Sequence, residues 1–196
     1  MYIQNLITIL IAGLFTSNIV FVRSWGVCPF LGMSKKTSSA IGMGLAVTFV
    51  VAVSTLLAYV LYNYMLVPLK LEYLDVLIFV LVIAAFVQLM EIILKRFTPG
   101  LYHSMGVYLP LITTNCIVLM MAITLGKDGG RDLFEVLFEA VVTGLGFLMA
   151  LIIMSGARER TEKSDIPECF KGFPIALITA AIIALAFYGL SGLTFF

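Results

Sequence analysis

The feature that most restricts the fold of this chain is a series of long runs without a charged residue. Neither Met1–Val22 nor Thr37–Leu69 contains an Asp, Glu, Lys or Arg. About 20 apolar residues are needed for a helix to cross the hydrocarbon core of a bilayer. Hydrophobic residues make up 62% of the sequence and charged residues 12%, well away from the composition of soluble domains. The sequence therefore predicts an all-α integral membrane protein.

Six membrane spans are expected from these runs. The first run is too long for the apolar region of a signal peptide and lacks a preceding basic segment, so we count it as a span. In chain order the spans are expected at Met1–Val22, about Ser39–Leu61, about Leu74–Leu94, Ser104–Gly126, Ala140–Ala157 and Gly172–Phe196.

The basic residues predict how the spans are oriented. Of the twelve Lys and Arg residues, nine fall after spans 1, 3 and 5, and three fall after spans 2 and 4. Because cytoplasmic loops carry the excess of Lys and Arg, both termini are expected on the non-cytoplasmic side. Three spans followed by three of opposite sense predict an inverted-topology 3+3 repeat, a single membrane domain 1–196 with half-repeats of about 1–97 and 98–196.

Spans 1 and 4 are expected to be interrupted, each close to a cysteine. Span 4 contains Pro110 and then the polar run Thr113–Cys116, and freed backbone groups at that depth must find partners. Thr113 and Thr114 can satisfy them locally, whereas the amide of Asn115 demands more partners. After span 1, Gly26, Pro29 and Gly32 argue against a continuous helix from Trp25 to Gly32, and Arg23 could be held against freed carbonyls.

The three cysteines admit different roles. A membrane cysteine can be a small packing residue, and two at broken helices can be thiolate ligands of zinc, cuprous copper or an iron–sulfur cluster. A cluster usually takes four cysteines, so Cys28 and Cys116 would need a second chain to complete the set. A disulfide between them is disfavoured on the cytoplasmic side. Cys169 lies in a loop without a partner at ligand spacing and is interpreted as incidental.

Charged residues near span ends give weaker hypotheses. Gln88 and Glu91 share one face of span 3, where a carboxylate suggests an ion path. Glu91 and Lys95 are also spaced to pair at the interface. The run Arg158–Lys163 is expected to open the loop after span 5 as a contact surface for a cytoplasmic subunit.

Glycine pairs in spans 2 and 5 predict close helix packing. Gly42 and Gly44 lie in one span, and Gly144 and Gly146 lie in the other. Small residues let neighbouring backbones approach closely in membranes, so packing is preferred over a direct functional role for all four.

Several function classes are disfavoured. The sequence contains no Ser-His-Asp arrangement, phosphate loop, dinucleotide fingerprint or metalloprotease motif, and no basic tract typical of nucleic-acid binding. The chain is therefore not expected to carry out hydride chemistry alone.

Four blocks of the sequence resemble one family of membrane subunits: GVCPFLGMSKK, GMGLAVTFV, YLPLITTNC and FKGFPIALITA. This family contains the A subunits of Rnf complexes, the ion-translocating ferredoxin:NAD+ oxidoreductases. It also contains the E subunits of Nqr, the sodium-pumping quinone reductase. The resemblance covers nearly the whole chain, and GVCPFLG and TTNC are its most specific motifs.

The resemblance implies a function in electron transfer across a bacterial or archaeal cytoplasmic membrane. Cys28 and Cys116 would each ligate an intramembrane [2Fe–2S] cluster, shared with a homologous E subunit of opposite orientation. Asn115 and Thr114 would lie around the cluster or an ion path, together with Glu91 and Gln88. No flavin or NAD is expected on this chain, because the other Rnf subunits (B, C, D and G) would handle ferredoxin, flavins and NAD. Either Na+ or H+ would be translocated.

Two alternatives remain open at the level of the sequence. One is a redox-inactive secondary transporter or assembly scaffold, in which the polar break at Thr113–Asn115 binds a solute or ion and the cysteines only pack. The other is the E subunit of the related quinone reductase. Stoichiometric iron and acid-labile sulfide would exclude the first.

Overall fold

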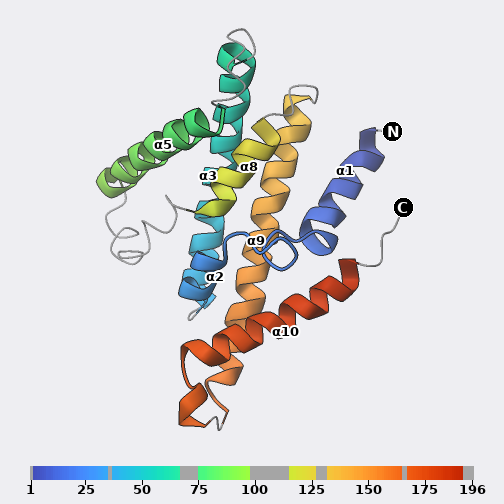
Figure 1. The fold of residues 1–196 in the computed structure, drawn as a ribbon, viewed down its shortest axis with the longest axis vertical. Helices are drawn as coiled ribbons and strands as arrows, with labels where there is room; N and C mark the ends of the chain where they lie inside the picture. Colours follow the sequence, from blue (N-terminus) through green and yellow to red (C-terminus); the bar gives the residue numbers. More distant parts are fainter. Residues whose placement is uncertain are drawn as a thin grey trace. The chain divides into compact units, whose positions relative to one another are not determined.

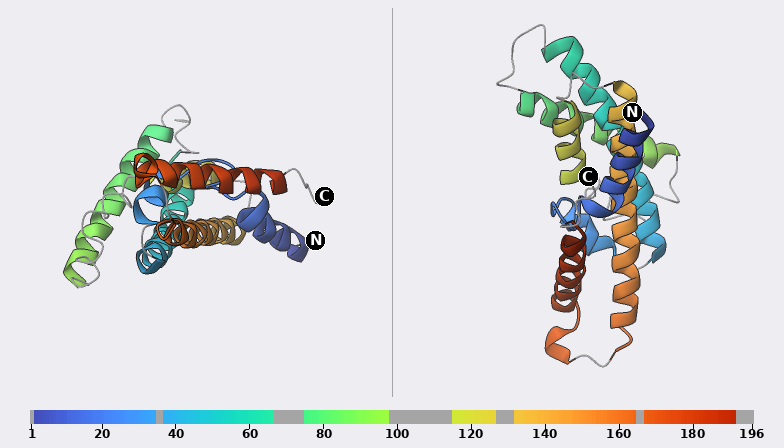
Figure 2. Two further views of the ribbon diagram at one scale, coloured as in Figure 1. Left: turned by 90° about the horizontal axis from the view of Figure 1, so that it is seen from below. Right: turned by 90° about the vertical axis from the view of Figure 1, so that its right-hand side faces the viewer.

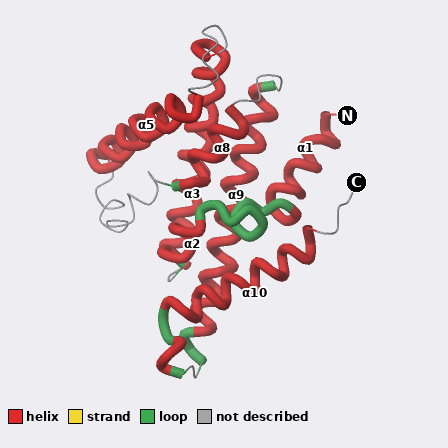
Figure 3. Tube along the Cα trace, viewed as in Figure 1, coloured by secondary structure: helices red, strands yellow, loops and turns green. Residues whose placement is uncertain are grey.

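The chain folds into helices throughout the part that the structure describes. This computed structural model describes residues 2–34, 37–66, 75–97, 115–126, 132–164 and 167–191, and every regular element in them is a helix (Figures 1 and 3). The elements are α1 (Tyr2–Ile11), π-helical η1 (Ala12–Thr16), α2 (Val27–Met33), α3 (Thr37–Leu61), π-helical η2 (Tyr62–Leu66), α5 (Asp75–Phe97), α8 (Cys116–Gly126), α9 (Leu133–Thr161), 3-10-helical η4 (Glu168–Phe170) and α10 (Phe173–Ser191). The prediction of an all-α protein is confirmed.

Two compact units make up the chain. Unit 1 consists of Met1–Leu45 and Val142–Phe196, and unit 2 consists of Ala46–Val141. The division falls inside α3 and α9, so each of these long helices contributes residues to both units. Each unit is described by itself below. The predicted half-repeats, 1–97 and 98–196, stay a prediction.

Unit 1 is built on close approaches to α9 at glycines. A Cβ atom on Gly146 would lie 2.7 Å from the carbonyl oxygen of Gly13 in η1, and one on Gly13 would lie 2.7 Å from Cγ1 of Val142. A Cβ on Gly44 of α3 would overlap Leu148 and lie 3.0 Å from its Cα. The packing role predicted for Gly44 and Gly146 is confirmed by these approaches, which only a residue without a side chain permits.

The loop between η1 and α2 is held by aromatic contacts. The ring of Phe21 meets Phe30 of α2 edge-on, with centroids 5.6 Å apart, and stacks on Phe187 of α10 at 4.6 Å. Figure 2 shows α10 running past η1 and this loop, against which it packs. Phe21 and Phe30 are buried, so the loop contributes to the core of unit 1 rather than to its surface.

Unit 2 contains the packed pair α5 and α8. Along α5 the buried residues Phe79, Ile83 and Val87 follow a spacing of four, which gives a single apolar face. In α8 the buried residues include Ile117 and Ala122, neither of which is exposed at all.

The predicted span boundaries agree at some ends and fail at others. The end of the second span at Leu61 coincides with the end of α3, and α5 covers the third span with a shift of a few residues. In contrast, α9 extends beyond the predicted Ala140–Ala157 at both ends, because acidic Glu135 in its first turn and basic residues in its last turn suit the helix dipole. The first helical stretch ends at Thr16 instead of Val22.

Two helical stretches among the described residues, Thr37–Tyr64 and Leu133–Glu162, are long and apolar enough to cross a bilayer. Shorter apolar helices occur at Gln4–Leu14, Leu77–Leu89, Cys116–Leu125 and Phe173–Gly189. Large apolar side chains are also exposed along α10, for example Ile182 and Leu185. Such an exposed apolar face is expected of a helix that meets lipid.

Candidate functional site

Cys28 lies in the first turn of α2 and is exposed. Gly26 precedes this helix with a positive φ of 79°, and its carbonyl accepts the backbone N–H of Phe30 at 3.2 Å. Pro29 falls in the first turn, where a missing N–H costs nothing. The expectation that no continuous helix runs from Trp25 to Gly32 is confirmed, because the helix begins at Val27. The break lies at Gly26, whereas Pro29 and Gly32 lie within α2.

Arg158 binds the C-terminal end of α2. Its Nη1 donates to the carbonyl oxygen of Leu31 and to Oγ of Ser34, both at 2.8 Å, and the residue is 7% exposed. A cation that binds the last carbonyls of a helix is favourable because that end carries partial negative charge. The prediction that a loop begins at Arg158 is wrong, because α9 continues to Thr161 and buries this arginine.

Arg23 takes a role that the sequence did not indicate. Its guanidinium carbon lies 5.3 Å from the centroid of the Trp25 ring, a cation–π arrangement. The backbone N–H of Trp25 donates to the carbonyl of Ile19 at 3.0 Å, which keeps the ring in place.

Asn115 and Cys116 form the start of α8, where the sequence predicted a break in span 4. The side-chain oxygen of Asn115 accepts the backbone N–H of Ile117 at 3.2 Å, and its carbonyl accepts that of Val118 at 3.1 Å. Asn115 thus caps the helix, and half-buried Cys116 is its first residue. The first-turn amides at this end point out of the helix and favour negative charge.

Asn115 also has an unused donor. The residue is 3% exposed, and its Nδ2 has no hydrogen-bond partner among the described residues. Buried polar groups in proteins are nearly always hydrogen-bonded, so an exception indicates a missing partner such as water, an ion or a ligand. The side-chain oxygen of Asn115 therefore stabilises the start of α8, whereas its side-chain nitrogen has no partner in the described part of the chain.

Asn18 is a functional candidate that sequence reasoning missed. It is fully buried, its Oδ1 accepts the N–H of Val20 at 3.1 Å, and its Nδ2 donates to the carbonyls of Leu14 at 3.2 Å and Gly146 at 3.0 Å. The signal that could have found it is a repeated pattern. Leu14-Phe-Thr-Ser-Asn18 and Leu111-Ile-Thr-Thr-Asn115 match in kind at each place and are separated by 97 residues.

Ser54 and Thr55 were also missed. Both are fully buried in α3, and neither hydroxyl has a hydrogen-bond partner among the described residues. Helical hydroxyls commonly donate to the carbonyl four residues earlier, as Thr124 and Thr179 do here. Two adjacent buried hydroxyls without that bond are potential oxygen ligands for a cation.

The remaining predicted residues are less well defined. Thr114 lies outside the described residues, as does the predicted proline break before it. Gln88 is exposed on α5, and Glu91 belongs to the same helix, although its side chain lies outside the described part. Cys28 belongs to unit 1 and Cys116 to unit 2.

The cysteines are in the thiol form. None of the three cysteines forms a disulfide. Among the described side chains, no three His, Cys, Asp or Glu residues gather into a group that could hold a metal. The exposed Cys28 and the half-buried Cys116 are thus two candidate ligands, not a complete metal site.

The fold and these sites define an all-helical membrane protein with two buried asparagines, Asn18 after η1 and Asn115 at the start of α8, the second directly before Cys116. The model of the family described as "Rnf-Nqr subunit, membrane protein" matches residues 6–194. The chain belongs to this Rnf-Nqr family of membrane subunits.

Curated relatives match the chain over nearly its full length. It is 48% identical to the A subunit of the Na(+)-translocating ferredoxin:NAD(+) oxidoreductase complex of Acetobacterium woodii, over 97% of this chain and 98% of the relative. It is 44% identical to the A subunit of the ion-translocating oxidoreductase complex of Azotobacter vinelandii, over 96% and 97%. It is 43% identical to the A subunit of the proton-translocating ferredoxin:NAD(+) oxidoreductase complex of Clostridium ljungdahlii, over 95% and 96%.

Proposed function

We propose that this chain is the A subunit of an ion-translocating ferredoxin:NAD+ oxidoreductase complex. The observation that carries the proposal is the similarity to relatives of that name across both chains, at 43–48% identity for those compared. In this role the chain has no complete active site of its own. It carries electrons across a bacterial or archaeal cytoplasmic membrane and helps couple their passage to ion movement.

The electron carrier is a [2Fe–2S] cluster held between this chain and a homologous E subunit. The donor set fits such a group, because Cys28 and Cys116 are outside any disulfide and chemically suited to iron. The unpartnered Nδ2 of Asn115, one residue before Cys116, is a donor of the kind that hydrogen-bonds to cluster sulfur. When bound, the cluster would take up and release one electron within the low-dielectric bilayer.

The topology that goes with this role is six spans in an inverted 3+3 repeat, with both termini outside the cytoplasm. The repeated Leu-x-Thr-polar-Asn pattern supports two related halves, because Asn18 and Asn115 both bind the backbone N–H two residues later. Their separation of 97 residues agrees with half-repeats near 1–97 and 98–196.

The partners in this role are five other subunits of the complex, namely the homologous E subunit together with the B, C, D and G subunits. Ferredoxin, NAD and flavins are handled by those chains, since this sequence has no dinucleotide fingerprint. No nucleic acid takes part.

The translocated ion is Na+ or H+, because relatives of nearly equal identity are named for different ions. The candidate ion path includes Glu91, Gln88 and Thr114, to which Ser54 and Thr55 add two buried hydroxyls. The variant Glu91→Gln tests the carboxylate: ion uptake into vesicles containing the complex should fall relative to electron transfer. Unchanged ion uptake per electron would exclude Glu91 from the path.

The test of the cluster uses the purified complex with Cys28→Ser, Cys116→Ser and the matched control Cys169→Ser. Cys169 is exposed like Cys28 but belongs to η4 and is not one of the proposed ligands. Iron and acid-labile sulfide would be quantified, and the reduced samples measured by low-temperature electron paramagnetic resonance.

Loss of one [2Fe–2S] signal in the first two variants, with all subunits assembled and the control unchanged, is the expected result. Wild-type iron and spectra in both variants would reject the shared cluster and favour a transporter or scaffold in which the cysteines only pack.

A further inference from the structure

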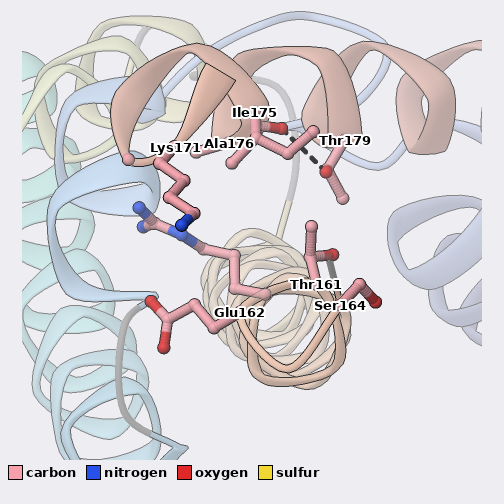
Figure 4. A pocket seen from close by; sticks show the side chains of 9 residues that line it. Thr161, Glu162, Ser164, Lys171, Ile175, Ala176 and Thr179 are labelled. Atoms are coloured by element: carbon pink, nitrogen blue, oxygen red, sulfur yellow. Dashed lines mark hydrogen bonds between the residues drawn. The ribbon is translucent and has the colours of Figure 1, made fainter. Parts of the chain in front are cut away.

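A cavity of about 210 Å³ lies in unit 1 between the end of α9 and the start of α10. Figure 4 shows the side chains that face it, with Thr161, Glu162 and Ser164 from the α9 side and Lys171, Ile175 and Thr179 from the α10 side. Arg158 lines this cavity and binds the carbonyl of Leu31 in α2, the helix that carries Cys28.

The cavity is lined by a buried cation without a counterion. Arg158 is 7% exposed, and both of its assigned hydrogen bonds start from Nη1. A guanidinium has five N–H donors, so those on Nε and Nη2 have no partner among the described residues. Removing an unpaired charge from water costs several kcal/mol. Such an arrangement is stable when an anion enters the cavity.

The total charge around the cavity is positive. Arg158 and Lys171 face one carboxylate, Glu162, and none of the three forms an ion pair within the described part of the chain. The first turn of α10, where Ile175 lines the wall, adds the positive end of a helix dipole. Among the described residues, the lining therefore carries one positive charge that is not compensated. Asp165, which follows Ser164 in the sequence, lies outside the described residues.

The hydroxyl groups of the cavity act as acceptors rather than donors. Thr161 donates to the carbonyl of Ala157 at 2.7 Å, and Thr179 donates to that of Ile175 at 2.8 Å. Because their protons are used within the helices, their oxygens can accept hydrogen bonds from a ligand. A matching ligand combines an anion for Arg158 and Lys171 with hydroxyl donors for Thr161, Thr179 and Glu162.

The position of the cavity indicates that its ligand is a lipid. It begins where the long apolar stretch Leu133–Glu162 ends, which is the level of the bilayer surface for a helix that crosses it. Ile175 and Ala176 give the cavity an apolar wall on the α10 side. Basic pockets between membrane helices are suited to anionic lipid headgroups.

We propose that this cavity, which we call the α9–α10 pocket, binds the headgroup of an anionic phospholipid that carries hydroxyl groups, such as phosphatidylglycerol. The phosphodiester lies against Arg158 and Lys171, and the headgroup hydroxyls face the oxygens of Thr161, Thr179 and Glu162. Since Arg158 also binds the end of α2, the lipid shares a residue with the helix that carries Cys28.

The test measures lipid binding to the complex that contains this chain, delipidated in detergent and titrated with dioctanoyl phosphatidylglycerol under native mass spectrometry. The decisive variant is Lys171→Gln, and Lys163→Gln is its matched control. Both lysines are exposed and precede α10, but only Lys171 lines the pocket. Lys171→Gln should weaken the binding of one lipid molecule about fivefold, whereas Lys163→Gln should bind like the wild type.

A second variant, Arg158→Lys, keeps the charge but removes the planar set of donors, and it should weaken the same binding step. Dioctanoylglycerol, which lacks the phosphate, should not occupy the site, and millimolar inorganic phosphate should not displace the lipid. Asp165→Asn should leave binding unchanged.

Four results would overturn the proposal. They are equal binding by the Lys171 and Lys163 variants, binding of dioctanoylglycerol as tight as that of the phospholipid, displacement by free phosphate, and tighter lipid binding by Asp165→Asn. The last would mean that the chain's own carboxylate neutralises the pocket. Iron content is not read in this test, so its outcome is independent of the cluster.

Discussion

Asn18 in unit 1 and Asn115 in unit 2 occupy equivalent places in two similar stretches of sequence, yet their side-chain nitrogens differ in hydrogen bonding. Both side-chain oxygens accept the backbone N–H two residues later, at 3.1 and 3.2 Å. The Nδ2 of Asn18 is satisfied by two carbonyls, one of them Gly146 on α9. The Nδ2 of Asn115 has no partner among the described residues.

The same contrast extends to other buried polar groups of the two units. In unit 1, Ser34 and Ser155 are buried and hydrogen-bonded, and Arg158 is bonded through Nη1 alone. In unit 2, Ser54 and Thr55 are buried with unused hydroxyls in the described part of the chain. A buried polar group that is not bonded costs free energy. Within the described part of the chain, unit 1 thus satisfies its buried polar side chains apart from Arg158, whereas unit 2 holds Ser54, Thr55 and Asn115 with an atom that has no partner.

The largest expected effect comes from Asn18→Ala compared with Asn115→Ala. The first variant loses three hydrogen bonds and leaves the N–H of buried Val20 without its acceptor, which should destabilise the protein by about 2 kcal/mol. The second loses only the cap of α8, which should cost below about 1 kcal/mol. Thermal unfolding of the detergent-solubilised complex, followed by subunit retention on a sizing column, measures both.

Equal destabilisation by the two alanine variants would contradict the difference between the asparagines. It would mean that the amide of Asn115 is bonded as fully as that of Asn18 in the assembled protein. Neither variant changes the charge of the chain, so electrostatic effects do not confuse the comparison.

An intermediate loss of stability is expected from a substitution at Gly146, the residue of α9 whose carbonyl accepts a hydrogen bond from Asn18. In Gly146→Ala the new Cβ would lie 2.7 Å from the carbonyl oxygen of Gly13 and 3.6 Å from Nδ2 of Asn18. Since a backbone oxygen cannot rotate away, η1 must move and the Asn18–Gly146 bond must lengthen, at a cost of about 1 to 2 kcal/mol.

Gly156→Ala on the same helix is the matched control for that substitution. No atom lies within 4 Å of its Cβ position, and alanine is the better helix former, so the stability should be unchanged or slightly higher. If both glycine variants unfold at the wild-type temperature, η1 does not depend on the close approach at Gly146.

The sequence pointed to Asn115 but not to Asn18, and the reason is physical. Apolar runs and charge counts predicted an all-helical membrane protein, and Asn115 attracted notice because it follows a proline and precedes a cysteine. Asn18 has no such neighbours, and its bond to Gly146 joins residues far apart in the chain. Long-range pairs of this kind leave no local trace. Only the repeated pattern at a distance of 97 residues could have revealed Asn18.

Helix ends were predicted worst, because charge was used as their marker. Arg158 was placed in a loop, although its charge stabilises the last turn of α9 and its donors bind α2. Pro29 was interpreted as a helix breaker, although its position in the first turn makes it harmless. Each residue type correctly indicated that a helix end is near. In the structure, both residues lie inside the helix and not beyond its end.

The smallest effect on stability, and the most direct test of the open donor, is expected from Asn115→Ser. A serine oxygen can still cap α8, so the change in stability should stay below about 0.5 kcal/mol. The amide donor is lost, however, and hydrogen bonds to cluster sulfur raise the reduction potential of iron–sulfur centres. If Nδ2 of Asn115 faces the proposed cluster, the midpoint potential of that [2Fe–2S] signal should fall in a redox titration followed by electron paramagnetic resonance.

Thr124→Ser serves as the control, because Thr124 is exposed on the same helix and donates to the carbonyl of Met120 at 2.7 Å, a bond that serine retains. An unchanged potential in Asn115→Ser would separate this amide from the cluster. The free donor would then belong to the ion path, and the ratio of ions to electrons, measured in vesicles, should change instead. Asn18 offers no such choice, since both of its donor bonds are already made within the chain.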